Sequence, residues 1–110
     1  MFTQWSAETL LGVMSESPSL EHIRQELNRT GYDFLMTDLD TALTFTALAR
    51  EAGNDTEKKL RNVMNAREAY FTVKRMREKL TFSSEQGIAF DKKLLELMQA
   101  LEQLGESVQT

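Results

Sequence analysis

The sequence lacks cysteine entirely and contains only one histidine and one proline among its 110 residues. Without cysteine there are no disulfides, no thiolate metal sites and no cysteine nucleophile. A single histidine also excludes the paired Glu-x-x-His motifs with which helical bundles bind two metal ions. We therefore expect no metal ion and no cofactor, and a stability that comes from packing alone.

Long hydrophobic runs and strand patterns are missing as well. The apolar cluster at residues 10–14 is far shorter than a membrane span. Apolar and polar residues nowhere alternate strictly for more than a few positions, which argues against strands. The first residues lack the basic start of a secretory signal, which favours a cytoplasmic protein. Hydrophobic residues make up 41% of the chain, which is typical of one folded domain with a single core.

What the sequence does contain is three long segments with apolar residues at helical spacing. The predicted helices cover about 33–52, 56–80 and 84–104. Connections of about three residues leave no room for the chain to cross a bundle, so successive helices should be antiparallel neighbours. Residues 32–105 are therefore predicted to form a three-helix core.

The joints between these segments carry helix-capping residues. Gly53 can adopt the left-handed conformation that ends a helix, and Asn54 or Asp55 can cap the next one. Ser83 and Gln86 have the spacing of a capping box, in which each side chain accepts a hydrogen bond from the other residue's backbone. Gly105 should end the last helix.

A short fourth helix is predicted over residues 18–31. Ser17 and Pro18 suit its N-cap and first helical position, and Gly31 suits its end. Three apolar residues would share one face of this helix: Leu20, Ile23 and Leu27. The predicted fold class is thus an all-α, antiparallel up-and-down bundle of three long helices plus one or two short N-terminal helices, within a single domain spanning 1–110.

The segment 1–17 supplies the candidate binding residues. It carries five large apolar side chains: Phe2, Trp5, Leu10, Leu11 and Met14. A helix this short is marginal alone. The segment therefore completes the core of its own chain, docks on a second copy or another protein, or stays mobile; apolar residues of this kind enter grooves.

Charge is unevenly distributed along the sequence. Residues 57–79 are strongly basic, whereas the chain as a whole has a net charge of −4. Domains that bind nucleic acid through backbone phosphates usually carry net positive charge, so we do not expect a nucleic-acid partner. A basic helix between acidic neighbours is better explained by complementarity within the bundle.

Two polar residues fall within apolar stripes. Asp38 does so on the first long helix and Arg67 on the second. We predict that they meet in a buried ion pair, with Tyr70 as a further donor, because a lone carboxylate would lose its hydration without compensation. The alternative is a small anion-binding site made of the same three residues. No second carboxylate or histidine converges there, so no catalytic activity is expected.

His22 should lie on the surface, roughly opposite the apolar face of its helix. The stretch Leu20-Glu21-His22-Ile23-Arg24-Gln25-Glu26 resembles the histidine phosphotransfer proteins, which are helical bundles of similar length with one exposed histidine. That family places a lysine and a small residue in the turn after the histidine, where this sequence has Gln25 and Glu26. The resemblance implies a phosphorelay role for His22 as an alternative function.

These observations favour a non-catalytic helical bundle that acts as an interaction or scaffold module. Its partner is expected to be another protein or a second copy of the chain, as in a homodimer.

Overall fold

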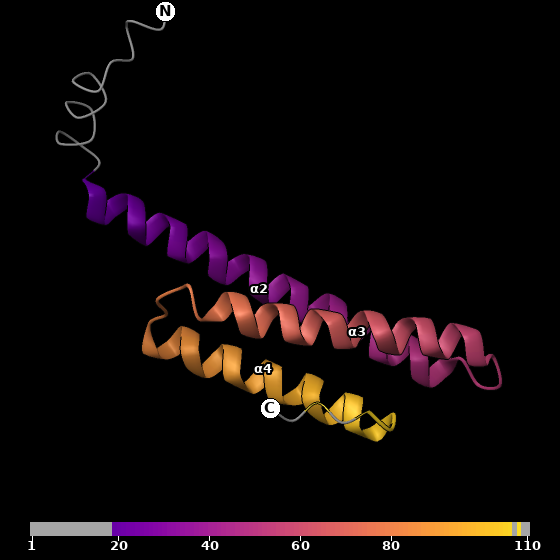
Figure 1. Ribbon diagram of the computed structural model, residues 1–110. Coiled ribbons are helices and arrows are strands. Elements are labelled where there is room, and N and C mark those ends of the chain that lie inside the picture. Colours follow the sequence, from indigo (N-terminus) through magenta and orange to yellow (C-terminus); the bar gives the residue numbers. More distant parts are fainter. Residues whose placement is uncertain (1–18, 107, 109–110) are drawn as a thin grey trace, which may run out of the picture.

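Three helices packed together make up the part of the chain that the computed structural model describes, residues 19–106 and 108. Successive helices run in opposite directions (Figure 1). The predicted all-α bundle of three helices is therefore confirmed for these residues. A further helix within residues 1–17, and the five candidate binding residues there (Phe2, Trp5, Leu10, Leu11 and Met14), lie outside the described residues.

The first helix, α2 (Leu20–Glu51), is a single element of 32 residues. The Ser19 side chain caps it by accepting a hydrogen bond from the backbone N–H of His22, 3.2 Å away. The predicted break at Gly31 is wrong, because the helix continues through this residue. A Cβ at Gly31 would lie 2.8 Å from both Cδ atoms of Leu80, so this glycine makes room for a neighbouring segment.

The second helix, α3 (Thr56–Arg77), begins where the sequence predicts. Gly53 has a φ of 60°, in the left-handed region that glycine adopts readily. The Asp55 carboxylate accepts a hydrogen bond from the backbone N–H of Lys58 at 3.0 Å, so Asp55 and not Asn54 is the N-cap. The turn between α2 and α3 thus rests on local capping.

The third helix, α4 (Ser84–Gln103), has the predicted capping box between Ser83 and Gln86. The backbone N–H of Gln86 donates to Ser83 Oγ at 3.1 Å, and the N–H of Ser83 donates to Gln86 Oε1 at 3.0 Å. Gly105, with a φ of 91°, follows the C-cap residue Leu104 as expected. Both ends of α4 are therefore set by residues within one turn.

The joint between α3 and α4 is longer than predicted, because α3 ends at Arg77 and not near Leu80. The Arg77 guanidinium turns back over this joint: Nη1 donates to the Leu80 carbonyl at 3.2 Å, and the guanidinium carbon lies 3.9 Å from the Phe82 ring centroid. The backbone N–H of Thr81 donates to Asn28 Oδ1 at 2.9 Å. The joint is thus fixed both to α2, through Asn28, and to the end of α3, through Arg77.

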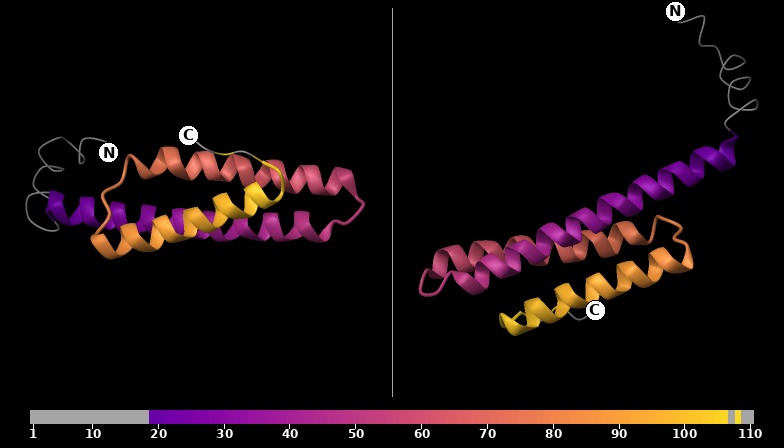
Figure 2. Two further views of the ribbon diagram at one scale, coloured as in Figure 1. Left: turned by 90° about the horizontal axis from the view of Figure 1, so that it is seen from below. Right: turned by 180° about the vertical axis from the view of Figure 1, so that it is seen from behind.

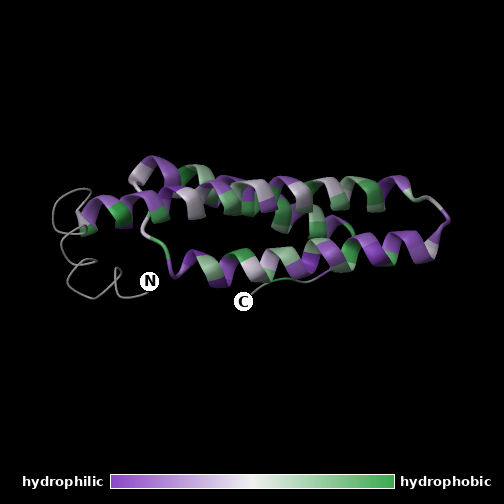
Figure 3. Cartoon of the chain, turned by 90° about the horizontal axis from the view of Figure 1, so that it is seen from above, coloured by the Kyte–Doolittle hydropathy of each residue, from purple (hydrophilic) through white to green (hydrophobic). Residues whose placement is uncertain are grey.

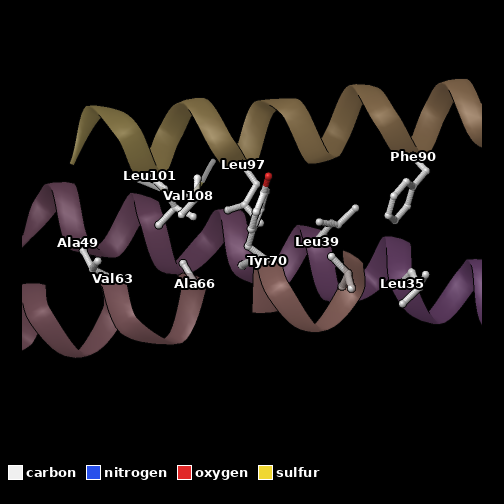
Figure 4. Packing of buried hydrophobic residues seen from close by; sticks show 12 residues of the cluster. Leu35, Leu39, Ala49, Val63, Ala66, Tyr70, Phe90, Leu97, Leu101 and Val108 are labelled. Atoms are coloured by element: carbon white, nitrogen blue, oxygen red, sulfur yellow. The ribbon is translucent and has the colours of Figure 1, made fainter. Parts of the chain in front are cut away.

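The core lies between the three helices and consists mostly of small and branched side chains. α3 follows α2 closely, whereas α4 packs mainly on α2 and meets α3 over a shorter stretch (Figure 2). Ten of the buried residues are labelled in the close view of Figure 4: Leu35, Leu39, Ala49, Val63, Ala66, Tyr70, Phe90, Leu97, Leu101 and Val108. The small alanines explain how α2 and α3 approach so closely.

Candidate functional site

The N-terminal part of α2 extends beyond the other two helices (Figure 1). The joint between α3 and α4 meets α2 at Asn28 through the Thr81 hydrogen bond, and at Tyr32, whose ring centroid lies 5.1 Å from that of Phe82. Before Asn28 no described residue of α2 is buried, and Glu21, Arg24 and Gln25 face the start of α4 only across an open depression that Ser83 and Gln86 also line. The described contacts therefore attach this part of α2 to the rest of the bundle only at its C-terminal end, near Asn28 and Tyr32.

Large apolar side chains lie along one side of α2, from this extension as far as Phe34. Leu20, Leu27 and Phe34 are 56%, 65% and 51% exposed. Their spacing of seven residues returns them to the same side of the helix every two turns, over a length of about 21 Å. We call these three residues, with the half-buried Ile23, the α2 seam. Figure 3 shows hydrophobic positions of α2, in green, close to its N-terminal end.

Charged residues flank the seam without crossing it. Arg24 Nη1 lies 2.9 Å from Glu21 Oε1, and Arg29 Nη2 lies 2.6 Å from Glu26 Oε1. Both pairs join residues three apart on the same exposed helix, so these charged side chains are paired with each other within α2. The arrangement of an apolar stripe with a charged border is the one by which a helix pairs with another helix.

The structure does not bring Asp38 and Arg67 together. Arg67 Nη1 lies 3.3 Å from Glu106 Oε1, and its guanidinium carbon lies 5.7 Å from the Phe71 ring centroid. Asp38 is half-buried and lines a shallow depression between α2 and α3 that includes Asn65 and Glu68 but not Arg67 or Tyr70. Asp38, Arg67 and Tyr70 thus do not form the predicted buried cluster. The alternative anion-binding site needs the same three side chains next to one another, so the structure does not contain it either.

Helix geometry explains why Asp38 and Arg67 do not meet. Asn65 and Arg67 are two residues apart on α3, and two residues correspond to about 200° around a helix. Since Asn65 borders the depression that Asp38 lines, Arg67 points away from it, towards the side of α4. Its partner Glu106 follows α4 and belongs to no apolar-periodic segment, so the sequence offers no signal for this contact.

Tyr70 is buried in the core, where Figure 4 shows it between α3 and α4 near Leu97. Its ring centroid lies 5.2 Å from that of Phe71 in an edge-to-face arrangement. Burial, and secondarily the nearby Glu102 carboxylate, raises the pKa of Tyr70 above its ordinary value of 10.0. The phenol therefore stays neutral, which suits a core residue.

His22 lies on the exposed surface of α2, as predicted. Among the described residues, no three histidine, aspartate or glutamate side chains gather as a metal site requires. The described helices also include no stretch that combines the length and hydrophobicity needed to cross a bilayer. The phosphorelay alternative stays a prediction, tested by incubation with a phosphodonor and a search for acid-labile phosphate on His22.

The α2 seam was only partly visible in the sequence. The sequence pattern places Leu20, Ile23 and Leu27 on one face of a separate short helix, and Phe34 on the next helix. The seven-residue spacing that joins them across Gly31 is the signal that could have identified the seam. Comparison with known proteins adds no further information about it: no protein-family model, curated protein or solved structure matches this chain.

Proposed function

We propose that this chain is a non-catalytic interaction module that binds a helix of another protein, or of a second copy, along the α2 seam. The observation that carries the proposal is the exposure of Leu20, Leu27 and Phe34 at seven-residue spacing along one side of α2, which buries no residue before Leu35. Contiguous exposed apolar patches of this kind usually mark interaction sites. The proposal includes the cytoplasmic location expected from the sequence.

The seam is better suited to a helix than to other ligands. It is straight and narrow, and its two charged borders are already paired within α2, so a partner gains chiefly by covering apolar surface. The competing arrangement is that residues 1–17 of the same chain form the additional N-terminal helix and cover the seam. That arrangement would make the seam part of the monomer's core and not an interaction surface.

Light scattering coupled to size exclusion tests self-association. We expect the mass of the full chain to rise with concentration, and Leu27→Glu to return it to the monomer mass, because a carboxylate cannot be buried in an apolar seam without a large penalty. Leu95→Glu is the matched control, since Leu95 is an exposed leucine on α4, 48% exposed and away from the seam. Equal effects of the two variants on the mass would contradict a seam-mediated dimer.

Photocrosslinking separates the remaining arrangements. A photoreactive residue replaces Leu27 in the full chain, with replacement of Leu95 as control, and crosslinked peptides are identified by mass spectrometry. Crosslinks from position 27 to a second copy or to one other protein support the proposal. Crosslinks confined to residues 1–17 of the same chain contradict it, and so does a pattern identical to that from position 95.

A further inference from the structure

The side of α2 that carries the seam continues beyond Phe34. Asp38, Thr41 and Phe45 follow Phe34 at intervals of four, three and four residues, and this spacing keeps them on the same side of the helix. These three residues form the α2 wall of the shallow depression between α2 and α3. The seam therefore leads directly into this depression, which begins about 6 Å along the helix from Phe34.

We call this hollow the α2–α3 depression. It has a volume of about 390 Å³, and its α3 wall includes Glu68, Ala69 and Thr72. Figure 2 shows α3 running beside α2 over this stretch. A partner helix that lies on the exposed seam thus meets one helix at its first turns and the space between two helices at its last ones.

The α2–α3 depression carries negative charge without a matching cation. Two carboxylates line it, Asp38 from α2 and Glu68 from α3, and none of its described lining residues is basic. Within the described part of the chain neither carboxylate belongs to an ion pair. Asp38 is also half-buried, so its carboxylate has lost part of its hydration. A cation brought by a partner would compensate this loss.

We propose that the occupant of the α2 seam is an amphipathic helix of another protein, with lysine or arginine about one helical turn beyond the end of its apolar stripe that lies on Phe34. The apolar stripe covers the seam, and the cation enters the α2–α3 depression and pairs with Asp38 and Glu68. A long basic side chain suits this place, because its aliphatic part can pack on Phe45 while its charge meets the carboxylates. This inference rests on the function proposed for the seam and names the chemistry of the partner.

A second copy of the chain matches this surface less well. The seam and its continuation include one charged residue between Leu20 and Phe45, namely Asp38. Two seams lying on each other therefore bring together further negative charge and no cation, and like charges at an interface oppose binding. Charge complementarity thus favours a partner of different sequence.

Two synthetic helical peptides test the proposal by fluorescence anisotropy with the full chain. Both carry leucines at seven-residue spacing, and they differ only one turn beyond the last leucine, where one has lysine and the other glutamine. The pair is also made with the altered residue before the first leucine, so that both directions of docking are sampled. We expect the lysine peptide to bind about three- to tenfold more tightly at low salt in one of the two directions. The preference should shrink at high salt, because partly exposed charges are screened.

Substitutions in the chain identify the carboxylates that cause the preference. Asp38→Asn and Glu68→Gln should each reduce the preference for the lysine peptide by about two- to threefold. Glu68 is exposed, so Glu68→Gln keeps the test decisive if Asp38→Asn disturbs folding. The matched control is Asp91→Asn, at an exposed carboxylate of α4, which should leave the preference unaltered.

The outcomes separate this inference from the seam itself. Equal binding of the two peptides that Leu27→Glu abolishes overturns the basic partner but supports the seam as a binding surface. Absence of binding, or binding that ignores Leu27→Glu, also overturns the inference, whereas self-association and crosslinking of the full chain judge the seam independently. A dimer of the full chain that Asp38→Asn weakens, without a preference between the peptides, makes a second copy the occupant and overturns the partner named here.

Discussion

The two parts of α2 have similar apolar periodicity but very different surroundings. From Leu35 onwards the helix buries five residues against α3 and α4: Leu35, Leu39, Ala42, Thr46 and Ala49. Before Leu35 no residue of α2 is buried, although Leu20, Ile23 and Leu27 repeat at helical spacing. One helix thus contains a packed part, Tyr32–Glu51, and an unpacked part, Leu20–Gly31.

This difference shows what an apolar stripe does and does not determine. A stripe indicates which side of a helix avoids water, but not which element covers it. In the packed part the covering elements are α3 and α4, whereas in the unpacked part the described residues provide only the joint between α3 and α4, which reaches Asn28 and Gly31. The unpacked part should therefore contribute little to the stability of the isolated chain, and its apolar residues should matter for association.

The largest expected effect is a difference in stability loss between two leucine-to-alanine substitutions, one in each part of α2. Leu39→Ala removes a fully buried side chain and should lower the free energy of unfolding by about 2–5 kcal/mol. Leu27→Ala, at a residue that is 65% exposed, should change it by no more than about 0.5 kcal/mol. Urea denaturation at low protein concentration, followed by circular dichroism, measures both. A loss at Leu27 as large as that at Leu39 would show that the seam is covered in the monomer.

A smaller effect is expected at the boundary between the two parts. Gly31→Val places branched carbons where a Cβ already lies 2.8 Å from Leu80, so we expect a net loss of about 1–2 kcal/mol despite the better helix former. Gly87→Ala is the control, because a Cβ at this glycine of α4 has no neighbour within 4 Å. That variant should gain about 0.5–1 kcal/mol.

Thermal denaturation of both glycine variants checks this prediction. Equal gains at the two positions would show that Leu80 moves aside freely and that the joint does not fix α2 at Gly31. A loss at Gly31 alone would confirm that the boundary between the parts is a close approach of two segments.

The capping residues could be predicted from the sequence because their energies are local. Gly53, the Ser83–Gln86 box and Gly105 each act within one turn of the helix end that they determine. Gly31 is also a glycine, but it is needed for a different reason: it makes room for Leu80, which lies far along the chain. A sequence pattern cannot distinguish a glycine that ends a helix from one that admits a neighbour.

The candidate site was harder to predict for the same reason. Asp38 is half-buried on α2, but Arg67 is exposed, because the side of α3 that packs is the one with Asn62, Val63, Ala66, Tyr70 and Val73. The rotation of α3 relative to α2, which a sequence pattern does not give, decides which side that is. The structure pairs Arg67 with Glu106, outside any helical pattern. The seam spans Gly31, from Leu27 to Phe34, and a glycine at that place in the sequence indicates a helix end.

The smallest expected effect compares one ion pair from each part. Lys93 Nζ and Asp40 Oδ1, 2.6 Å apart, join α4 to the packed part, whereas Arg29 and Glu26 pair within the unpacked part. Double-mutant cycles should give a coupling of about 0.5–1 kcal/mol for Asp40→Asn with Lys93→Gln, and about 0.2–0.5 kcal/mol for Glu26→Gln with Arg29→Gln.

The two coupling energies should differ because the two ion pairs break in different events. The unpacked part can open without separating any helices, so its pair breaks in local fluctuations before the bundle unfolds, whereas the pair to α4 breaks only when the helices part. Hydrogen exchange gives an independent measurement: amides of residues 24–30 should exchange faster than those of residues 35–49. Equal protection in the two ranges would mean that the seam is already covered, and the distinction between the two parts of α2 would then be lost.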